Sequence, residues 1–498
     1  MERIYMPSNL KRRISSQSLW VLAGITVLSV GSYLVYSGVF YHFGFPLDDA
    51  WIHQTYARNL AVRGEWSFIP GQPSGGSTSP LWSALLAIGF WLKLAPYFWT
   101  YFLGGIGLWL LAVVGESAVR QLIPSYCPKI PWVGAALALE WHLVWAAASG
   151  METLLFSLLM TVSLVQIILG TEINFRLGLI IGISCWVRPE GITLLGPAVL
   201  LNLLTRSPWS QRLRRLVNLG VGFGSVFALY LLFNLFISHL PFPNTFYAKQ
   251  AEYLEYLNIP FLVRWGREIT PALEGAGIFL LPGFVITLIS AFRRRNWGVV
   301  VAAAWVLGFL AVYAWRLPVT YQYGRYVIPS MPVFFLLGLM GLAKYSSLAN
   351  QYWQRIFSFS WRMAVGAVLI VFWVVGAIHY ARDVAFIEGE MVSTAKWVAA
   401  EIPPTDLIAV HDIGAMGFFG NHDLVDLAGL VSREVIPFLR DENQIAAYLN
   451  RREVKYLITF PNWYQQLTRN LRAVHSTNAP YAPVPGEGNM TVYQWSGP

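Results

Sequence analysis

The chain carries few charged residues for its length. Only 12% of its 498 residues are Asp, Glu, Lys or Arg, whereas a soluble domain has about a quarter. It has two cysteines, Cys127 and Cys185, which match no metal-ligand spacing and imply no disulfide framework. The sequence also contains no internal repeat and no low-complexity segment. These absences argue against a soluble domain, a disulfide scaffold and a repeat protein.

Apolar residues dominate the composition and make up 56% of the chain. Many apolar runs approach the ~20 residues that a helix needs to cross a bilayer, which predicts a mainly α, polytopic membrane protein with about 11–13 spans. The first run is too long for a signal-peptide core and lacks a cleavage signal, so we expect a retained span. The expected spans are 19–40, 80–95, 97–118, 131–148, 150–170, 176–204, 215–238, 273–292, 297–315, 325–343 and 362–380.

The net charge of +9 comes from short basic clusters between the apolar runs. This is the positive-inside pattern of a membrane protein, so we expect no nucleic-acid partner. The clusters are residues 11–13, 206–215, 293–295 and 344–362. The N-terminus is then cytoplasmic, and the opposite, outer face carries everything after about residue 380 and three loops: 42–79, 241–270 and 316–325.

One predicted span is interrupted. Within residues 173–204, the sequence Arg188-Pro189-Glu190-Gly191 places a proline and a glycine where a helix would continue. Such a break occurs in a membrane only where protein or a water-filled cavity surrounds it. We therefore expect it to line a site, with its side of the membrane left open. Arg188 and Glu190 either neutralise each other there or line a polar cavity.

The composition becomes globular at about residue 384. Helices and short strands alternate from there, which is typical of a small α/β domain. The chain thus divides into a transmembrane module, 1–383, and an α/β domain, 384–498. The expected helices are 391–401, 441–451 and 462–474, and the expected strands are 407–410, 424–426, 455–460 and 491–495.

Two adjacent carboxylates, Asp48 and Asp49, follow the first apolar run directly. Ionisable side chains at a membrane boundary are costly and usually mark a site or a partner. Neighbouring carboxylates also repel, which raises the pKa of one of them and suits it to act as a base. The simpler interpretation is an N-cap for a helix over residues 50–63. A cap explains only one aspartate, so we expect both a cap and a catalytic group.

Further polar residues lie in segments between or next to the expected spans. Ser77 and Thr78 belong to a glycine-rich loop, which either approaches a ligand closely or is an ordinary connection. Lys249 either pairs with a lipid phosphate or snorkels to the interface. Arg325 can contact a phosphate with two donors. Glu152, between two spans, is as open to a structural role as to a functional one.

Polar loops also follow two of the expected strands in the C-terminal domain. His411 and Asp412 come directly after the first, as ligand-binding loops of α/β sheets often do, and Asp426 comes at the end of the next. One histidine with nearby carboxylates is weak evidence for a metal, so we expect no metal site.

Taken together, these motifs resemble the C-type integral-membrane glycosyltransferases, which take a sugar from a polyprenyl-phosphate carrier on the outer face of a membrane. Within that superfamily the chain looks most like the arabinofuranosyltransferase branch that acts on cell-wall arabinan, and like its bacterial relatives. The matching stretches cover almost the whole chain in order: 48–52, 56–60, 76–82, 149–153, 188–191, 243–249, 325–329, 412–414 and 426–430.

The resemblance implies a helical membrane module with an outer C-terminal domain, and a catalytic base at Asp48 or Asp49. The implied reaction is inverting transfer, in which a carboxylate takes the proton of an acceptor hydroxyl that displaces the lipid phosphate. The candidates for contacts to the donor phosphate or lipid head group are Lys249, Arg325, Tyr326 and Arg188. The candidates for other substrate contacts are His53, Arg58, Ser77, Thr78, Glu152, Glu190, Asn244, Tyr247, His411, Asp412 and Asp426.

The implied partners are a polyprenyl-phosphate-linked sugar, the bilayer, and a glycan or lipid acceptor of the cell envelope. Arabinofuranose is the expected sugar only through the branch resemblance. The implied location is the bacterial cytoplasmic (inner) membrane, with the active site and the C-terminal domain extracytoplasmic. No cofactor is expected, although a divalent cation between carboxylate and phosphate stays open. The alternative function is a transporter or flippase of lipid-linked sugars; a transporter would show mid-span charges and inverted repeats.

Overall fold

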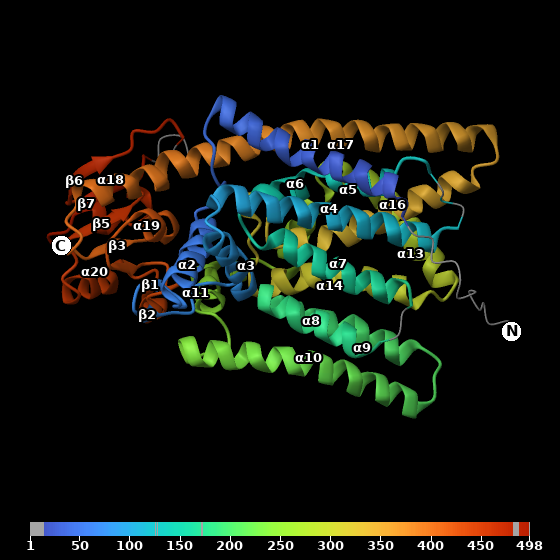
Figure 1. Ribbon diagram of the computed structural model, residues 1–498, viewed down its shortest axis with the longest axis horizontal. Helices are drawn as coiled ribbons and strands as arrows, with labels where there is room; N and C mark the ends of the chain where they lie inside the picture. Colours follow the sequence, from blue (N-terminus) through green and yellow to red (C-terminus); the bar gives the residue numbers. More distant parts are fainter. Residues whose placement is uncertain (1–13, 125, 127, 171–172, 482–487, 498) are drawn as a thin grey trace.

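The computed structural model describes residues 14–124, 126, 128–170, 173–481 and 488–497. The basic cluster 11–13 and Cys127 lie outside the described residues. Long helices run side by side along the long axis of the molecule, and a smaller sheet-containing domain lies at one end (Figure 1). The predicted fold class, a helical membrane bundle with a small C-terminal α/β region, is confirmed.

Seven helices of the described chain are long and apolar enough to cross a membrane by length and composition. Their apolar residues face either neighbouring helices or the surroundings of the bundle, as expected for a protein solvated by lipid. They are α1 (Ser16–Phe40), α4 (Pro96–Leu122), α10 (Trp209–Ser238), α13 (Ala276–Arg293), α14 (Trp297–Arg316), the run Tyr321–Leu348 that contains α15 (Tyr321–Gly324) and α16 (Met331–Leu348), and the run Tyr352–Glu401 that begins with α17 (Tyr352–Ile387).

Shorter apolar helices fill the bundle between the long ones. They are α3 (Pro80–Trp91), α5 (Trp132–Leu139), α6 (Trp141–Ala148), α7 (Thr153–Ile168), α8 (Phe175–Val187) and α9 (Leu195–Leu204). Because several of them are shorter than a bilayer is thick, the expected count of about 11–13 spans stays a prediction.

Two of the expected spans are divided. The segment expected as one span over 131–148 is two short helices, because Glu140 lies in extended backbone and its carboxylate caps α6 by accepting from Leu143 N at 3.1 Å. The break expected at Arg188 is present: α8 ends at Val187, and a 3₁₀ segment, η1 (Pro189–Leu194), leads into α9. The proline has no N–H to continue the helical ladder, so the chain turns there.

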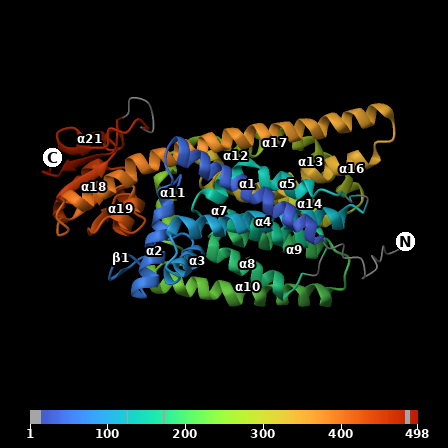
Figure 2. The same ribbon diagram turned by 45° about the horizontal axis from the view of Figure 1, so that its top comes forward.

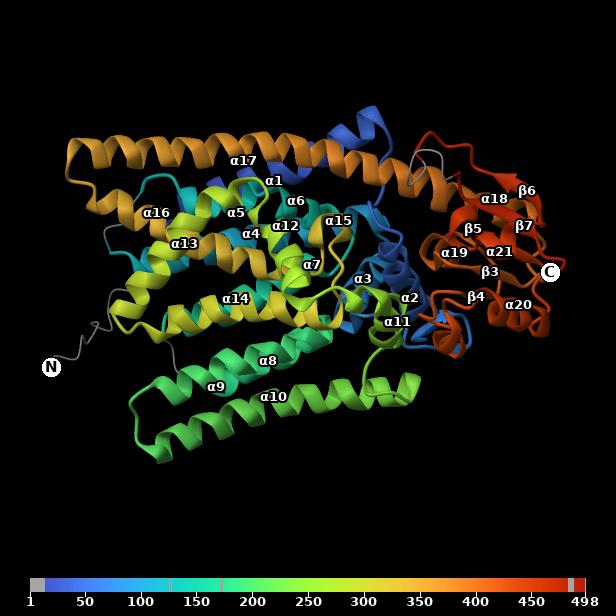
Figure 3. The same ribbon diagram turned by 180° about the vertical axis from the view of Figure 1, so that it is seen from behind.

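Two helices lie between the bundle and the C-terminal domain (Figures 1 and 3). They are α2 (Asp49–Arg63) and α11 (Asn244–Glu252). A short hairpin, β1 (Ser67–Ile69) with β2 (Gln72–Pro73), follows α2, and α12 (Phe261–Leu273) follows α11. The aspartate pair lies at the start of α2, so both the bundle and the C-terminal domain contribute to the surroundings of these two side chains.

The C-terminal domain contains a five-stranded mixed sheet in the order β4-β3-β5-β7-β6. In this order, β4, β3 and β5 pair in parallel, and β7 is antiparallel to both of its neighbours, β5 and β6. The strands are β3 (Ile408–Val410), β4 (Leu424–Asp426), β5 (Tyr456–Thr459), β6 (Arg472–Ser476) and β7 (Thr491–Gln494). The helices are α18 (Ser393–Glu401), α19 (Ile413–Phe419), α20 (Glu442–Arg451) and α21 (Gln465–Thr468).

The helix expected over residues 462–474 is wrong. Only the short turns Pro461–Trp463 and Gln465–Thr468 are helical there, and Arg472–Ser476 forms β6. This segment pairs with β7 at the edge of the sheet, so ladder hydrogen bonds to a distant strand override the local helix preference.

One continuous helical rod joins the bundle to the C-terminal domain (Figure 2). Helix α17 continues through a π-helical turn, Glu388–Val392, into α18, so residue 383 lies inside a helix and the division of the chain at that point stays a prediction. Buried Glu390 in this turn accepts hydrogen bonds from Thr477 Oγ1, Asn489 Nδ2 and Met490 N. The side chain of Asn489 is therefore engaged inside the domain.

Candidate functional site

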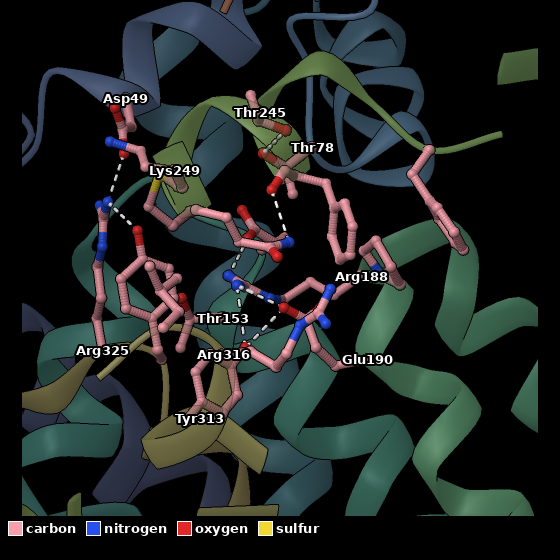
Figure 4. Close-up of a pocket in the computed structure, with 18 of the residues that line it drawn as sticks. Asp49, Thr78, Thr153, Arg188, Glu190, Thr245, Lys249, Tyr313, Arg316 and Arg325 are labelled. Carbon is pink, nitrogen blue, oxygen red and sulfur yellow. Dashed lines mark hydrogen bonds and ion pairs between the residues drawn. The ribbon is translucent and has the colours of Figure 1, made fainter. Parts of the chain in front are cut away.

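A cavity of about 350 Å³ opens where α2, η1, α11, α14 and the segment directly after α15 come together (Figure 4). Its wall is largely apolar and includes Ile52, Met151, Ile192, Phe242, Phe246, Val312, Trp315 and Leu317. Its polar lining is Asp49, His53, Thr78, Glu152, Thr153, Arg188, Glu190, Thr193, Thr245, Lys249, Gln250, Tyr313, Arg316, Arg325 and Tyr326. Nine of the residues that the sequence singled out are among them.

Asp49 forms the acidic side of one end of this cavity. Arg325 Nη2 donates to its Oδ2 at 2.7 Å, and Lys249 lies across the same end. Burial alone would raise the pKa of Asp49, but the positive charges of Arg325 and Lys249 lower it to about 2. The side chain is 29% exposed, so an ionised carboxylate is open to a ligand in the cavity.

Asp48 faces away from the cavity, towards the C-terminal domain. Its Oδ2 accepts from Gly414 N at 2.6 Å and its Oδ1 from Ala415 N at 2.7 Å. Asp48 occupies the N-cap position of α2, as predicted, but its side chain makes no hydrogen bond to the start of that helix. It caps α19 instead. Burial raises the pKa of this carboxyl to about 7, although the two N–H groups act in the opposite direction.

A second polar cluster, the Arg188 cluster, lies apart from Asp49 in the same cavity (Figure 4). Arg188 donates to Glu152 Oε1 at 2.9 Å, to Glu190 Oε1 at 3.4 Å and to the Tyr313 hydroxyl at 3.3 Å. The Tyr313 hydroxyl in turn donates to Glu190 Oε1 at 2.7 Å. The break in the chain at Pro189 is what brings Arg188 and Glu190 to the cavity.

His53 connects this cluster to α2. It lies one helical turn after Asp49 and so shares its face of the helix. Its Nε2 is 3.2 Å from Glu152 Oε2, and its Nδ1 is 3.2 Å from the hydroxyl of Ser77. Ser77 therefore contacts the histidine on the side away from the cavity and does not line the cavity. Thr78 does line it and donates to Thr245 at 3.0 Å.

Tyr326 lies close to both arginines. The guanidinium carbons of Arg325 and Arg188 are 4.9 and 5.2 Å from the centre of its ring. Its hydroxyl accepts from Arg325 Nη2 at 3.0 Å. Within the described part of the chain, Arg325 Nε and Nη1 and Arg188 Nε are buried without a hydrogen-bond partner. Buried guanidinium donors without partners indicate room for an acceptor from outside the chain.

The other residues singled out from the sequence do not line the cavity. Arg58 donates to Gly417 O and Phe418 O, and Asn244 N donates to Gly75 O at 2.9 Å. The ring of Tyr247 packs edge-on against Phe246, 5.3 Å between centroids.

The three candidates from the C-terminal domain have contacts of their own. Asp426 accepts from Ala428 N and Val431 N and so fixes the loop after β4. His411 Nδ1 is 2.8 Å from the Tyr464 hydroxyl, and burial lowers its pKa to about 4. Burial, together with Asp48 and Asp49, raises the pKa of Asp412.

Several residues that line the cavity were not predicted from the sequence. Tyr313 and Arg316 lie three positions apart, on one face near the end of α14. Their spacing could have indicated a shared polar face, but a tyrosine and an arginine are also typical of the interfacial end of an apolar span. Thr193 and Gln250 carried no signal.

Among the described residues, no group of three or more His, Cys, Asp or Glu side chains is placed to hold a metal ion. The expectations of no metal and no required cofactor stay predictions.

Solved structures similar to this one support the fold, and a family match covers the C-terminal part of the chain. Residues 377–493 match a family described as "Domain of unknown function (DUF8728)", and none of the curated proteins compared has a matching sequence. The structure is similar to ArnT from Cupriavidus metallidurans in the apo state, with a TM-score of 0.57 and 15% identity over 96% of this chain and 98% of that chain. It is also similar to ArnT from the same organism bound to undecaprenyl phosphate, with a TM-score of 0.56 and the same identity and coverage.

A third similar structure is the arabinofuranosyltransferase AftD from Mycobacteria, with a TM-score of 0.52 and 15% identity. The match covers 90% of this chain and 35% of AftD. These likenesses extend over the bundle and the C-terminal domain together. Over nearly its whole length, the chain has the fold of the C-type integral-membrane glycosyltransferases.

Proposed function

We propose that this protein transfers a sugar from a polyprenyl-phosphate donor to an acceptor hydroxyl. The observation that carries the proposal is the carboxylate of Asp49 beside Arg325 and Lys249 in a cavity with a largely apolar wall. A lipid-linked sugar phosphate presents the matching chemistry: an apolar tail, an anionic phosphate and a polar sugar. The fold supports it as well, because one similar structure is described as bound to undecaprenyl phosphate.

Arg325 and Lys249 are the proposed ligands of the donor phosphate. The guanidinium of Arg325 uses Nη2 for Asp49 and Tyr326, and its Nε and Nη1 have no partner within the described chain. Each of these unpartnered N–H groups can donate to a phosphate oxygen. A positive charge at this point also stabilises the negative charge that develops on the phosphate as it leaves.

Asp49 is the proposed general base. Both oxygens of Asp48 are occupied by backbone N–H groups, whereas Asp49 is exposed to the cavity. In the transfer step, Asp49 takes the proton of the acceptor hydroxyl, and the acceptor oxygen forms a bond to the anomeric carbon. The bond from that carbon to the phosphate oxygen breaks, and the phosphate leaves with the electron pair, so the anomeric configuration inverts.

The setting of this reaction is also proposed. The chain is a multi-pass membrane protein, and we place it in the bacterial inner membrane with its N-terminus in the cytoplasm. The cavity and the C-terminal domain then face the cell envelope, where the acceptor is a glycan or a lipid. Arabinofuranose is the first sugar to test, because of the resemblance to the arabinofuranosyltransferases. No cofactor is required, since phosphate is already a good leaving group.

The test is sugar transfer by the purified full-length protein in nanodiscs. We expect the wild type to consume one donor from a panel of undecaprenyl-phosphate sugars that begins with arabinofuranose. Asp49→Asn should lower kcat by about 10²-fold or more, the scale expected when a general base is lost. The matched control is Asp423→Asn, the same change at an exposed position of the C-terminal domain, which should transfer at the wild-type rate.

Equal turnover by wild type and Asp49→Asn would overturn the assignment of the base. In sealed proteoliposomes, movement of the lipid-linked sugar across the bilayer without any transfer product would favour a flippase instead.

A further inference from the structure

The arginines at the two polar ends of the cavity differ in how many of their nitrogens have no hydrogen-bond partner. Arg325 has two nitrogens without partners within the described chain. Arg188 already contacts two carboxylates, Glu152 and Glu190, and has only Nε left without a partner. A phosphate beside Arg188 would therefore meet two negative charges within a few ångströms, which disfavours it strongly at this burial. At the other end two cations, Arg325 and Lys249, face Asp49 and Glu252, and Arg325 keeps two nitrogens unpartnered within the described chain, so that end suits the phosphate better.

The Arg188 end offers both kinds of hydrogen-bonding group. Glu190 Oε2 is buried and has no donor within the described chain, and Arg188, with a side chain 7% exposed, has its Nε free. Thr153 and Gln250 line the same cavity. A sugar hydroxyl both donates and accepts, so it satisfies a carboxylate oxygen and a guanidinium nitrogen at once. Unpartnered buried groups of both kinds are the pattern that a neutral polyhydroxylated ligand completes.

The two ends are separate but close. Figure 4 shows Arg325 beside Asp49, and Arg188 beside Glu190 and Tyr313. The ring of Tyr326 lies near both guanidinium groups. If the donor phosphate binds at Arg325, Arg188 is free to contact the sugar that the phosphate carries. Lys249 and Arg316 are the other lysine and arginine of the lining, and Arg316 is exposed with its guanidinium over the ring of Trp315 at 5.4 Å.

We propose that Arg188 and Glu190 form the subsite for the hydroxyl groups of the donor's sugar, and that this sugar carries no acidic group. The inference rests on the proposed transfer reaction and adds its substrate class. The carboxylates of Glu152 and Glu190 repel a uronic acid, whereas a neutral pentose or hexose gains hydrogen bonds to Glu190 Oε2 and Arg188 Nε. Arg188, which the sequence suggested for the phosphate, thereby contacts the sugar.

The test measures lipid binding and needs no turnover. The full-length protein in nanodiscs is titrated with undecaprenyl phosphate alone and with undecaprenyl phosphate carrying arabinofuranose, a neutral hexose or a uronic acid. Wild type should bind at least one neutral-sugar lipid about 10-fold or more tighter than the uronic-acid lipid. Glu190→Gln should weaken the neutral-sugar lipid about 10-fold, which corresponds to about 1.4 kcal/mol, and leave sugar-free undecaprenyl phosphate within about twofold.

Two further variants complete the design. Arg325→Gln should weaken the sugar-free and sugar-bearing lipids alike, because it removes a phosphate contact. Glu255→Gln makes the same change as Glu190→Gln at an exposed position and should bind every lipid like wild type. A further arm uses deoxy-sugar lipids: removing the recognised hydroxyl should weaken binding to wild type and not to Glu190→Gln.

The outcomes separate this proposal from the transfer reaction. The subsite is overturned if Glu190→Gln weakens sugar-free and sugar-bearing lipids equally, or if wild type binds all four lipids alike. If the binding pattern holds and no sugar is transferred, the subsite stands and the transfer reaction fails. If transfer occurs but Glu190→Gln leaves the choice among sugars unchanged, the reaction stands and the subsite fails.

Discussion

Two neighbouring aspartates have opposite environments in this protein. Asp48 points towards the C-terminal domain and accepts two backbone hydrogen bonds, while Asp49 points into the cavity and pairs with Arg325. Their pKa values move in opposite directions, to about 7 and about 2. The difference follows from their partners: burial governs the first carboxyl, whereas two cations overcome burial at the second.

This contrast predicts a pH dependence at the scale of single residues. Asp49 in the free protein stays ionised well below neutral pH, so kcat/KM should show no loss of the base above about pH 4. In Arg325→Gln the cation that lowers this pKa is gone and burial still raises it, so the acid limb of kcat/KM should move up by about 1–3 pH units. The measurement is the pH profile of transfer for both proteins.

The shape of the profile, and not the absolute rate, decides this prediction. Arg325→Gln will also transfer more slowly because it loses a phosphate contact. If the acid limb lies at the same pH in the two proteins, Asp49 is not a base whose pKa is lowered by Arg325.

At the scale of elements, the turn before Arg325 is strained. Gln322, Tyr323 and Gly324 all have positive φ, at 54°, 59° and 67°. Left-handed backbone costs roughly 1–2 kcal/mol at each residue with a side chain. Such strain persists only where the surroundings hold it, and here it directly precedes the arginine that faces Asp49.

Tyr323 is the residue that holds this turn against the bundle. Its hydroxyl donates to Asp383 Oδ1 on α17 at 3.2 Å and lies 3.2 Å from His379 Nδ1. Its ring packs edge-on against Trp141 and Trp145, with centroids 5.2 and 5.5 Å away. The contacts come from two helices, α6 and α17, so the position of the turn depends on how these helices pack.

Tyr323→Phe should therefore loosen the turn. It leaves Asp383 without one of its donors, at a cost of about 1–3 kcal/mol, and lets Arg325 shift. Transfer should slow about 10-fold or more, because a displacement of about 1 Å at a reacting group costs up to ~10²-fold. Thermal unfolding and kcat of the purified protein are the measurements.

The matched control is Tyr352→Phe, which removes a hydroxyl from a tyrosine that is 71% exposed. If Tyr323→Phe behaves like this control in both measurements, the turn does not depend on the hydroxyl contacts.

At the scale of the whole molecule, α2 clamps the C-terminal domain through both ends of α19. The carboxylate of Asp48 accepts from N–H groups at the start of α19, and Arg58 donates to Gly417 O at 3.0 Å and to Phe418 O at its end. A negative group at the start and a positive group at the end of a helix both suit its dipole. Gly414 makes the close approach possible, because a Cβ there would lie 2.0 Å from Asp48 O.

Arg58→Ala should release the end of α19. It removes two charge-assisted hydrogen bonds to backbone carbonyls, so local opening of α19 should become easier by about 1–3 kcal/mol. Amide hydrogen exchange resolved over residues 404–430 is the measurement. Arg63→Ala, on the exposed end of α2, is the control. Equal protection of α19 in the two variants would show that the clamp does not need Arg58.

Much of the architecture could be predicted from the sequence because its causes are local. Run lengths of apolar residues indicated the bundle, Pro189 and Gly191 indicated the break, and all the strands of the predicted C-terminal domain except β6 were expected near their observed positions. The aspartate pair, Lys249 and Arg325 were also singled out, because charged residues at a membrane boundary are costly and stand out in an apolar chain.

What the sequence by itself determined was thus the class of the protein and the residue types available for its chemistry. Only the tertiary structure decided which aspartate faces the cavity, because the deciding partners are distant: Arg325 is 276 residues from Asp49, and Gly414 is 366 residues from Asp48. The same holds for β6, which pairs with a distant strand, and for Tyr313, which joins the Arg188 cluster from another helix. Apolar patterning acts over a few turns of chain, whereas burial, pairing and pKa depend on groups that only folding brings together.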